Sequence, residues 1–198
     1  MKTQIGSTLS NPAQKITQPL EVLPAGPITL RRWKRALVQQ LDDAVRASLP
    51  ELSPFMPWAT ADHGLQQSRE FVEKSMAEWN TGETWNYAMI SDAGAVVGGT
   101  GLMTRMGPGV LEIGYWVHSA HAGLGYASAA ASALAETGLQ IGGVDRIVIK
   151  HDKANPASGR VAAKAGFTQV GSDKVEPKAP SETGVQLIWE RSAGLGDV

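Results

Sequence analysis

The stretch LEIGYWVHSAHAGLGYASAAASAL, residues 111–134, decides the fold. It opens with the alternation typical of a β-strand, which places on one face Leu111, Ile113, Tyr115 and Val117 and on the other Glu112, Gly114 and Trp116. It closes as an alanine-rich helix with one apolar stripe, made of Leu124, Ala127, Ala131 and Leu134. The turn between strand and helix, residues 118–125, contains two glycines and lets the backbone approach a large ligand closely.

This turn has the character of an anion site. A strand that opens through glycines into a helix presents free backbone N–H groups and the positive end of the helix dipole in the same direction, which favours phosphate. Two common nucleotide motifs are excluded, because no Gly-Lys-Ser/Thr follows the turn and Asp145 stands at the wrong end of the next strand to bind a ribose. Taken alone, the turn also fits an ordinary glycine-rich connection without a ligand.

A second motif follows in the chain. Residues 145–152, DRIVIKHD, have the alternation of a short strand and continue into NPASGRVAAKAGF, residues 155–167. Asn155 is placed as a helix N-cap with Pro156 at the first helical position, while Gly166 and Phe167 fit a left-handed C-terminal cap with its hydrophobic contact.

The order strand, glycine turn, helix, strand, Asn-capped helix and Gly-Phe resembles the acetyl-CoA-dependent N-acetyltransferases of the GNAT superfamily. The pairing of GYWV with GLGYA, followed by Asn155-x-x-Ser158 and KAGF, resembles more narrowly the RimJ/RimL branch. The resemblance extends from Ile28 to Arg191. It implies an α/β (α+β) GNAT fold, with a mixed, mostly antiparallel sheet of about seven strands flanked by about four helices.

The remaining elements agree with one such domain. Residues 1–27, with their prolines and polar residues, are expected to form an extended or mobile lead-in, residues 28–192 the acetyltransferase domain, and residues 193–198 a tail. Apolar periodicity predicts helices over residues 34–49, ending at Pro50, and over residues 62–80. Further strands are predicted over residues 28–33, 85–91, 95–103, 168–175 and 185–191.

The resemblance implies a cofactor site at the glycine turn, where such enzymes hold the pyrophosphate of coenzyme A through backbone amides. By position, the cofactor-binding residues are Trp116, Val117, His118, Ala122, Gly123, Leu124, Gly125, Tyr126, Ala127, Asn155 and Ser158. Ala122 departs from the family pattern, which has Gln or Arg at that position, so a side-chain contact is missing. A backbone amide at the strand end, residues 116–118, would stabilise the thioester oxygen.

Two residues are candidates for proton transfer. Glu112 is a mid-strand carboxylate among apolar neighbours, a setting that suits the general base; it also fits a structural glutamate paired with an arginine or facing water. Ser158, one turn into the Asn155 helix, matches the family position of the acid that protonates the leaving thiolate, and it also fits a helper cap.

An acceptor pocket is predicted in the segment ELSPFMPWATADHG, residues 51–64. Prolines interrupt regular structure there, yet the segment carries Phe55, Met56 and Trp58, which with Trp116 would line a substrate pocket. A hydrophobic cluster packed beneath the loop is an equally good interpretation.

Composition narrows the class of protein. A chain of 198 residues with a formal net charge of -1 and no long basic run is not expected to bind nucleic acid through electrostatics. It has no cysteine, no apolar run long enough for a membrane span and no secretory signal, so a cytoplasmic protein is expected. His118 and His121 lie near each other without a third ligand, so no metal site is expected.

The predicted function is direct transfer of the acetyl group of acetyl-CoA to a primary amine, because no cysteine or Ser-His-Asp pattern supports an acyl-enzyme. The RimJ/RimL resemblance implies a protein N-terminal amine as acceptor. A small amine, such as an antibiotic or an amino-acid derivative, and a non-catalytic acyl-CoA-binding module stay open. The oligomeric state stays open as well, a homodimer included.

Overall fold

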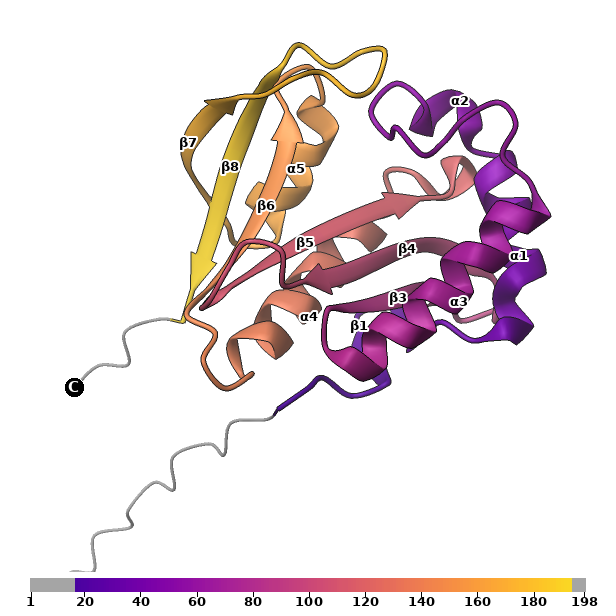
Figure 1. Cartoon of the computed structure of the whole chain (residues 1–198), viewed down its shortest axis with the longest axis horizontal. Coiled ribbons are helices and arrows are strands. Elements are labelled where there is room, and N and C mark those ends of the chain that lie inside the picture. The colour runs from indigo at the N-terminus through magenta and orange to yellow at the C-terminus, as the bar shows by residue number, and fades with distance from the viewer. Residues whose placement is uncertain (1–16, 194–198) are drawn as a thin grey trace, which may run out of the picture.

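The computed structural model describes residues 17–193, and in that part of the chain eight strands form one sheet (Figure 1). The strands are β1 (Val22–Ala25), β2 (Ile28–Arg32), β3 (Thr84–Ser91), β4 (Val96–Met103), β5 (Val110–Val117), β6 (Arg146–Asp152), β7 (Thr168–Lys174) and β8 (Val185–Ser192). Their order in the sheet is β1-β2-β3-β4-β5-β6-β8-β7, and β5–β6 is the only parallel pair among them. The predicted mixed, mostly antiparallel sheet is confirmed.

Helices cover both faces of the sheet. The described residues contain α1 (Val38–Arg46), α2 (Leu49–Leu52), α3 (Leu65–Thr81), α4 (Tyr126–Leu139) and α5 (Pro156–Lys164), with short 3-10 turns η1 (Arg35–Leu37) and η2 (Ser119–His121). Helices α1 and α3 pack on one face with the apolar residues of β3 and β4, whereas α4 packs on the other face and contacts α5.

The small residues of α4 explain how closely it lies on the sheet. Ala131 and Leu134 are fully buried, as predicted, and Gly138 faces the side chain of Ile147. A Cβ at Gly138 would stand 2.7 Å from Ile147 Cδ1, so any larger residue there would require the Ile147 side chain to shift. Leu124, by contrast, precedes the helix and is 56% exposed, so the expectation that it belongs to the buried stripe is wrong.

The sheet splits between β5 and β6. The two strands pair only from Val110 to Ile113 on one side and from Arg146 to Ile149 on the other. Beyond that point β5 stays with β4, while β6 continues to Asp152 beside β8. Figure 1 shows the resulting separation between the central strands and the C-terminal group of β6, β7, β8 and α5. This divergence creates a gap in the middle of the sheet.

Several sequence expectations differ from the structure in detail. The sheet has eight strands rather than seven because β1, in the segment expected to be an extended lead-in, pairs with β2 and adds an edge to the domain. A fifth helix, α2, appears because Pro50 occupies its first turn; the preceding helix α1 ends earlier, at Arg46, and not at Pro50. Residues 1–16 and 194–198 lie outside the described part, and so do the expectations for them.

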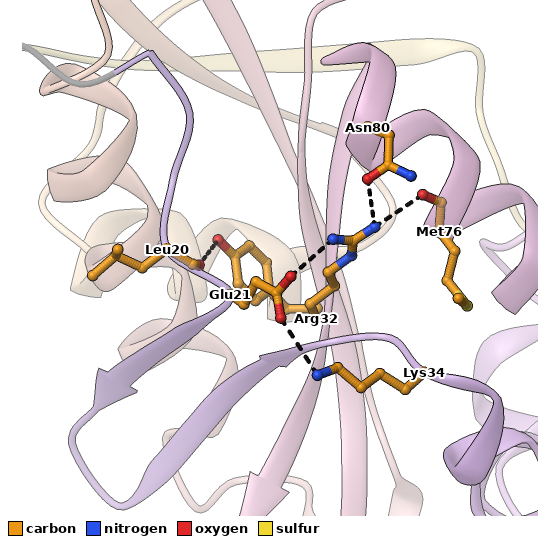
Figure 2. Close-up of polar contacts among 7 residues, drawn as sticks. Leu20, Glu21, Arg32, Lys34, Met76 and Asn80 are labelled. Atoms are coloured by element: carbon orange, nitrogen blue, oxygen red, sulfur yellow. Dashed lines mark hydrogen bonds and ion pairs between the residues drawn. The ribbon is translucent and has the colours of Figure 1, made fainter.

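Polar contacts anchor the beginning of the described chain (Figure 2). Arg32 donates to Glu21 Oε1 at 2.9 Å and to Asn80 Oδ1 at 2.8 Å, and it also bonds the carbonyl of Met76 on α3. Tyr87 donates to the carbonyl of Leu20 at 2.8 Å, and burial raises the pKa of this tyrosine. These bonds hold residues 20–25 against the first strands and α3, on the side of the sheet away from the gap.

Candidate active site

The glycine turn delivers free amides to the start of α4. Gly123 and Gly125 have φ values of 80° and 82°, the left-handed region that favours glycine. Gly125 is the N-cap of α4 and caps it without a side chain, and the helical hydrogen-bond ladder begins with Ala129 N donating to Gly125 O at 3.0 Å. The amides of the first turn therefore have no intrahelical acceptor and are available to an anion.

A groove of about 330 Å³ lies in front of these amides. Its wall contains all but two of the predicted cofactor-binding residues, namely Trp116, Val117, Ala122, Gly123, Gly125, Tyr126, Ala127, Asn155 and Ser158. The side chains of His118 and Leu124 are not part of it. Leu124 faces solvent, and His118 Nδ1 accepts a hydrogen bond from Ala120 N at 3.0 Å, so neither side chain lines the groove. The cofactor contacts expected of these two residues involve their backbone groups and stay a prediction.

The backbone geometry of β5 determines which N–H of residues 116–118 points into the gap between β5 and β6. His118 N donates to Val97 O at 2.9 Å, and Gly114 O accepts from Thr100 Oγ1 at 2.9 Å, so alternate residues from 114 to 118 direct their backbone groups toward β4. The N–H of Val117 therefore points to the opposite edge, into the gap beside β6. Of the three amides considered from the sequence, only that of Val117 is free of the sheet.

A larger cavity of about 690 Å³ adjoins the groove on the α3 side of the sheet. It includes all four predicted pocket residues, Phe55, Met56, Trp58 and Trp116, together with Glu112. Six residues line both spaces and mark where they meet: Phe55, Met56, Tyr115, Trp116, Asn155 and Ser158. The split sheet thus joins an anion-binding groove to a second cavity.

Two tryptophans form an aromatic wall of this cavity. The ring centroids of Trp58 and Trp116 lie 6.2 Å apart in an edge-to-face arrangement, and His63 lies edge-on to Trp58 at 6.3 Å. Trp116 lies against Gly99 of β4, where a Cβ would stand 2.6 Å from its Nε1 atom. The absence of a side chain at Gly99 thus allows the indole to lie directly on β4, and Trp58, 44% exposed, contributes a cavity wall rather than a buried cluster.

Tyr115 and Ser158 meet at the junction of the two spaces. Tyr115 Oη lies 2.8 Å from Ser158 Oγ and donates to the carbonyl of Ser158 at 3.1 Å. Burial raises the pKa of Tyr115 to about 12, although the hydrogen bond with Ser158 opposes this shift. The phenol is therefore protonated at neutral pH. Asn155 accepts from Ser158 N at 3.1 Å, which confirms its predicted N-cap role.

Glu112 is buried and lies at the cavity wall, but it has a partner. Arg105 Nε donates to Glu112 Oε2 at 2.9 Å, and its Nη2 donates to the other carboxylate oxygen. The hydrogen bond with Glu112 raises the pKa of Arg105. Glu112 is 6% exposed, whereas the Arg105 side chain is 62% exposed. The structure thus shows the arginine-paired glutamate that the sequence analysis held as the alternative to a general base.

The segment between β7 and β8 closes the far side of the larger cavity. Asp152 accepts hydrogen bonds from Ala154 N, Thr183 N and Gly184 N at 2.8–3.0 Å. Burial opposes ionisation of Asp152, but these bonds outweigh it and lower its pKa. Ser181 N donates to Pro54 O at 2.9 Å, so this segment touches the loop before α3, as their proximity in Figure 1 also shows.

Sequence reasoning missed several residues of the site. Tyr115 was assigned only to one face of the strand. A tyrosine that lies inside a domain needs a hydrogen-bond partner, and this was the available signal. Arg160 and Lys164, four residues apart on α5, line the groove and supply positive charge. No signal in the sequence connects Asp152 to residues 183–184, because that contact depends on the antiparallel pairing of β6 with β8.

Two absences hold for residues 17–193. They contain no group of three or more His, Cys, Asp or Glu residues that could hold a metal ion. None of their helices is long and apolar enough to cross a membrane.

A split mixed sheet that joins a helix N-terminus with free amides to a second cavity is the arrangement of an acyltransferase that uses coenzyme A thioesters. A family model described as "Acetyltransferase (GNAT) domain" matches residues 28–168. The chain belongs to this acetyltransferase family, and acetyl-CoA is its acetyl donor. The groove fits coenzyme A, because main-chain donors at α4 and two cations on α5 face a ligand that carries several phosphate charges.

Solved structures share the fold at low sequence identity. The microcin C7 self-immunity acetyltransferase MccE, in complex with acetyl-CoA and AMP, has a TM-score of 0.79 at 20% identity, covering 87% of this chain and 99% of its own. The ribosomal L7/L12 alpha-N-protein acetyltransferase RimL, in complex with coenzyme A, has 0.78 at 22%, covering 87% and 98%. RimJ of Mycobacterium smegmatis has 0.73 at 23%, covering 90% and 88%. The comparison with curated protein sequences finds no match.

Proposed function

We propose that this acetyltransferase acetylates the free N-terminal amine of a protein. The observation that carries the proposal is the second cavity, which at about 690 Å³ is twice the size of the cofactor groove and reaches from β4 and β5 to the segment before β8. Its wall combines charged side chains of both signs with the glycine backbone of β4, groups that suit an extended peptide end. The fold shared with RimL and RimJ supports the same acceptor class.

Glu112 is the proposed base for the incoming amine. An ammonium group must lose a proton before it can attack, and Glu112 is the carboxylate at the cavity wall on the same sheet face as Trp116. In this proposal the acceptor's ammonium replaces the exposed guanidinium of Arg105 beside the carboxylate. A cation is exchanged for a cation, so the buried charge of Glu112 is never left without a partner.

Two further tasks fall to residues at the junction. The Val117 amide, free on the gap side of β5, is the proposed hydrogen-bond donor to the thioester oxygen. Ser158 is the proposed acid for the departing thiolate. The Tyr115 hydroxyl has one proton, which can go to the carbonyl or to the hydroxyl of Ser158; when it goes to Ser158 Oγ, the serine proton is free to point into the cavity, so Tyr115 orients the acid.

A thiol-release assay tests this function directly. The chain has no cysteine, so free coenzyme A can be read with a thiol reagent without background from the enzyme. Short peptides with Ser, Ala or Met at a free N-terminus are compared with the same peptides blocked at that amine, and mass spectrometry locates the acetyl group. We expect turnover that requires the free α-amine.

The same assay separates the competing functions. The facing rings of Trp58 and Trp116 favour, as a second candidate, a small amine with a flat ring, which the aromatic wall would contact. Turnover with such amines and none with any peptide would contradict a protein acceptor. Binding of acetyl-CoA without turnover across peptides and small amines would indicate a binding module.

A further inference from the structure

His121 differs from the other three histidines of the chain. His63 is bonded to Ser68 Oγ at 3.0 Å, and His118 accepts from a backbone amide. His151 is bonded at both ring nitrogens, to Asp152 O and to Trp189 Nε1. Within residues 17–193, neither ring nitrogen of His121 has a hydrogen-bond partner in the protein. Its polar atoms are therefore available to a ligand.

The position of this ring is fixed by its aromatic neighbours. His121 is the last residue of η2 and lines the cofactor groove. Its ring stacks on Tyr126, the first residue of α4, with centroids 6.0 Å apart and planes 26° apart, and His118 lies edge-on at 5.4 Å. The imidazole is thus held beside the helix N-terminus. The next residue, Ala122, offers a methyl group and no donor.

We propose that His121 donates a hydrogen bond to the diphosphate of acetyl-CoA and is the side-chain partner in a site otherwise made of main-chain amides. The inference rests on the cofactor groove described above. A neutral imidazole carries one N–H donor, and hydrogen bonds to a charged phosphate are stronger than neutral ones. Because stacking on Tyr126 orders the ring in advance, little entropy is lost on binding.

Coenzyme A carries a diphosphate and a 3′-phosphate, and the charged residues of the groove indicate which of the two His121 contacts. Arg160 and Lys164 line the groove from α5, whereas His121 lines it from η2, close to the N-terminus of α4; the carboxylate of Glu51 also belongs to the lining. The structure therefore assigns His121 to the diphosphate, which the α4 amides also face. The 3′-phosphate is the competing partner that the experiment must exclude.

Three probes and one variant test the proposal. His121→Phe keeps a flat ring for stacking on Tyr126 but has no donor. Calorimetry measures the Kd of coenzyme A, dephospho-coenzyme A and pantetheine for the wild type and this variant. We expect the Kd of the first two to rise about 10-fold, the effect of one charge-assisted bond, and that of pantetheine to stay unchanged.

Each other outcome has a defined meaning. A loss of affinity for coenzyme A but not for dephospho-coenzyme A would assign the bond to the 3′-phosphate. An equal loss of affinity for pantetheine would show a structural effect of the substitution. Either result overturns the proposal, and so does an unchanged Kd for coenzyme A. A wild-type protein that fails to bind coenzyme A would refute the cofactor groove itself. If the variant does not fold, the imidazole ¹⁵N signals of the wild type decide, since only those of His121 should shift with dephospho-coenzyme A and not with pantetheine.

Discussion

Tyr115 and Ser158 are joined by a hydrogen bond of 2.8 Å between their hydroxyl groups, and this bond links β5 to the first turn of α5 across the open end of the split sheet. It lies where the cofactor groove and the acceptor cavity meet. The proposed acid is therefore a pair of residues held by two different elements. Any change in the separation of β5 and α5 alters the pair.

Removal of either hydroxyl should affect turnover more than binding. We expect Ser158→Ala to lower kcat by 10- to 100-fold with little change in KM, because the bond matters most as charge develops on the thiolate. Tyr115→Phe should cost less, since water can orient Ser158 in its place. If the two act as one unit, the double variant will resemble Ser158→Ala in steady-state assays. Additive losses would mean that the hydroxyls act separately.

The raised pKa of Tyr115 also predicts weaker stability in alkali. The unfolded chain ionises its tyrosines near pH 10, while folded Tyr115 keeps its proton until about pH 12. The stabilisation is thus fully present below pH 10 and is lost as the pH rises from 10 to 12. Urea unfolding between pH 8 and 11.5 should show a steep decline in the wild type. In Tyr115→Phe the decline should be shallower, though not absent, because Tyr87 contributes with the same sign.

Gly125→Val should remove coenzyme A binding. Gly125 has a φ of 82° at the N-terminus of α4, so a branched side chain both strains the backbone by roughly 1–2 kcal/mol and covers the amides. Gly94→Val is a matched control, because Gly94 has a φ of 80° in the β3–β4 turn with no atom near its Cβ position. Calorimetry should show an affinity at least 10-fold weaker for the first variant alone. Equal affinities in two folded variants would exclude main-chain recognition at this turn.

Trp58→Ala should raise the KM of the acceptor and leave acetyl-CoA affinity nearly unchanged. The ring is partly exposed and lines the acceptor cavity but not the cofactor groove. Leu65→Ala provides the comparison, because Leu65 is 38% exposed on α3 and lines neither space. A fall in thermal stability without a kinetic effect would instead assign Trp58 a purely structural role.

Glu112→Gln should lower kcat/KM and remove the acidic limb of its pH profile, because the amide keeps the shape but takes no proton. Arg105→Gln breaks the same ion pair from the exposed side and leaves the carboxylate in place. It should reduce stability and retain the acidic limb. Should the two variants show the same profile, Glu112 serves only to hold the β4–β5 turn through Arg105.

Local patterns in the sequence predicted the elements that build the site. The strand over residues 111–117, the glycines of the turn and the Asn155 cap are visible over a few residues, and they are confirmed respectively by the pairing of β5, by positive φ angles and by a hydrogen bond. Strand β1 was not predicted because four residues that include a proline carry almost no periodic signal, and the strand exists only through its pairing with β2.

Long-range contacts could not be predicted from the sequence. Glu112 was recognised as a functional candidate, but its pairing with Arg105 depends on how the β4–β5 turn folds back over the strand. Tyr115 and Ser158 are separated by 43 positions, and only the parallel placement of β5 beside β6 brings them together. Residue types and spacing thus indicated the chemistry, while the tertiary arrangement determined which candidates are already engaged by a neighbour.

The split between β5 and β6 also has a mechanical consequence. Two groups of strands, β1–β5 and β6–β8, are connected within the sheet by four register pairs. A molecule that fills the gap contacts both groups of strands and therefore adds a second connection between them. Ligand binding should therefore slow hydrogen exchange at the amides facing the gap, including that of Val117, and couple the motions of the two groups. In this sheet, filling the site should therefore also strengthen the connection between the two groups of strands.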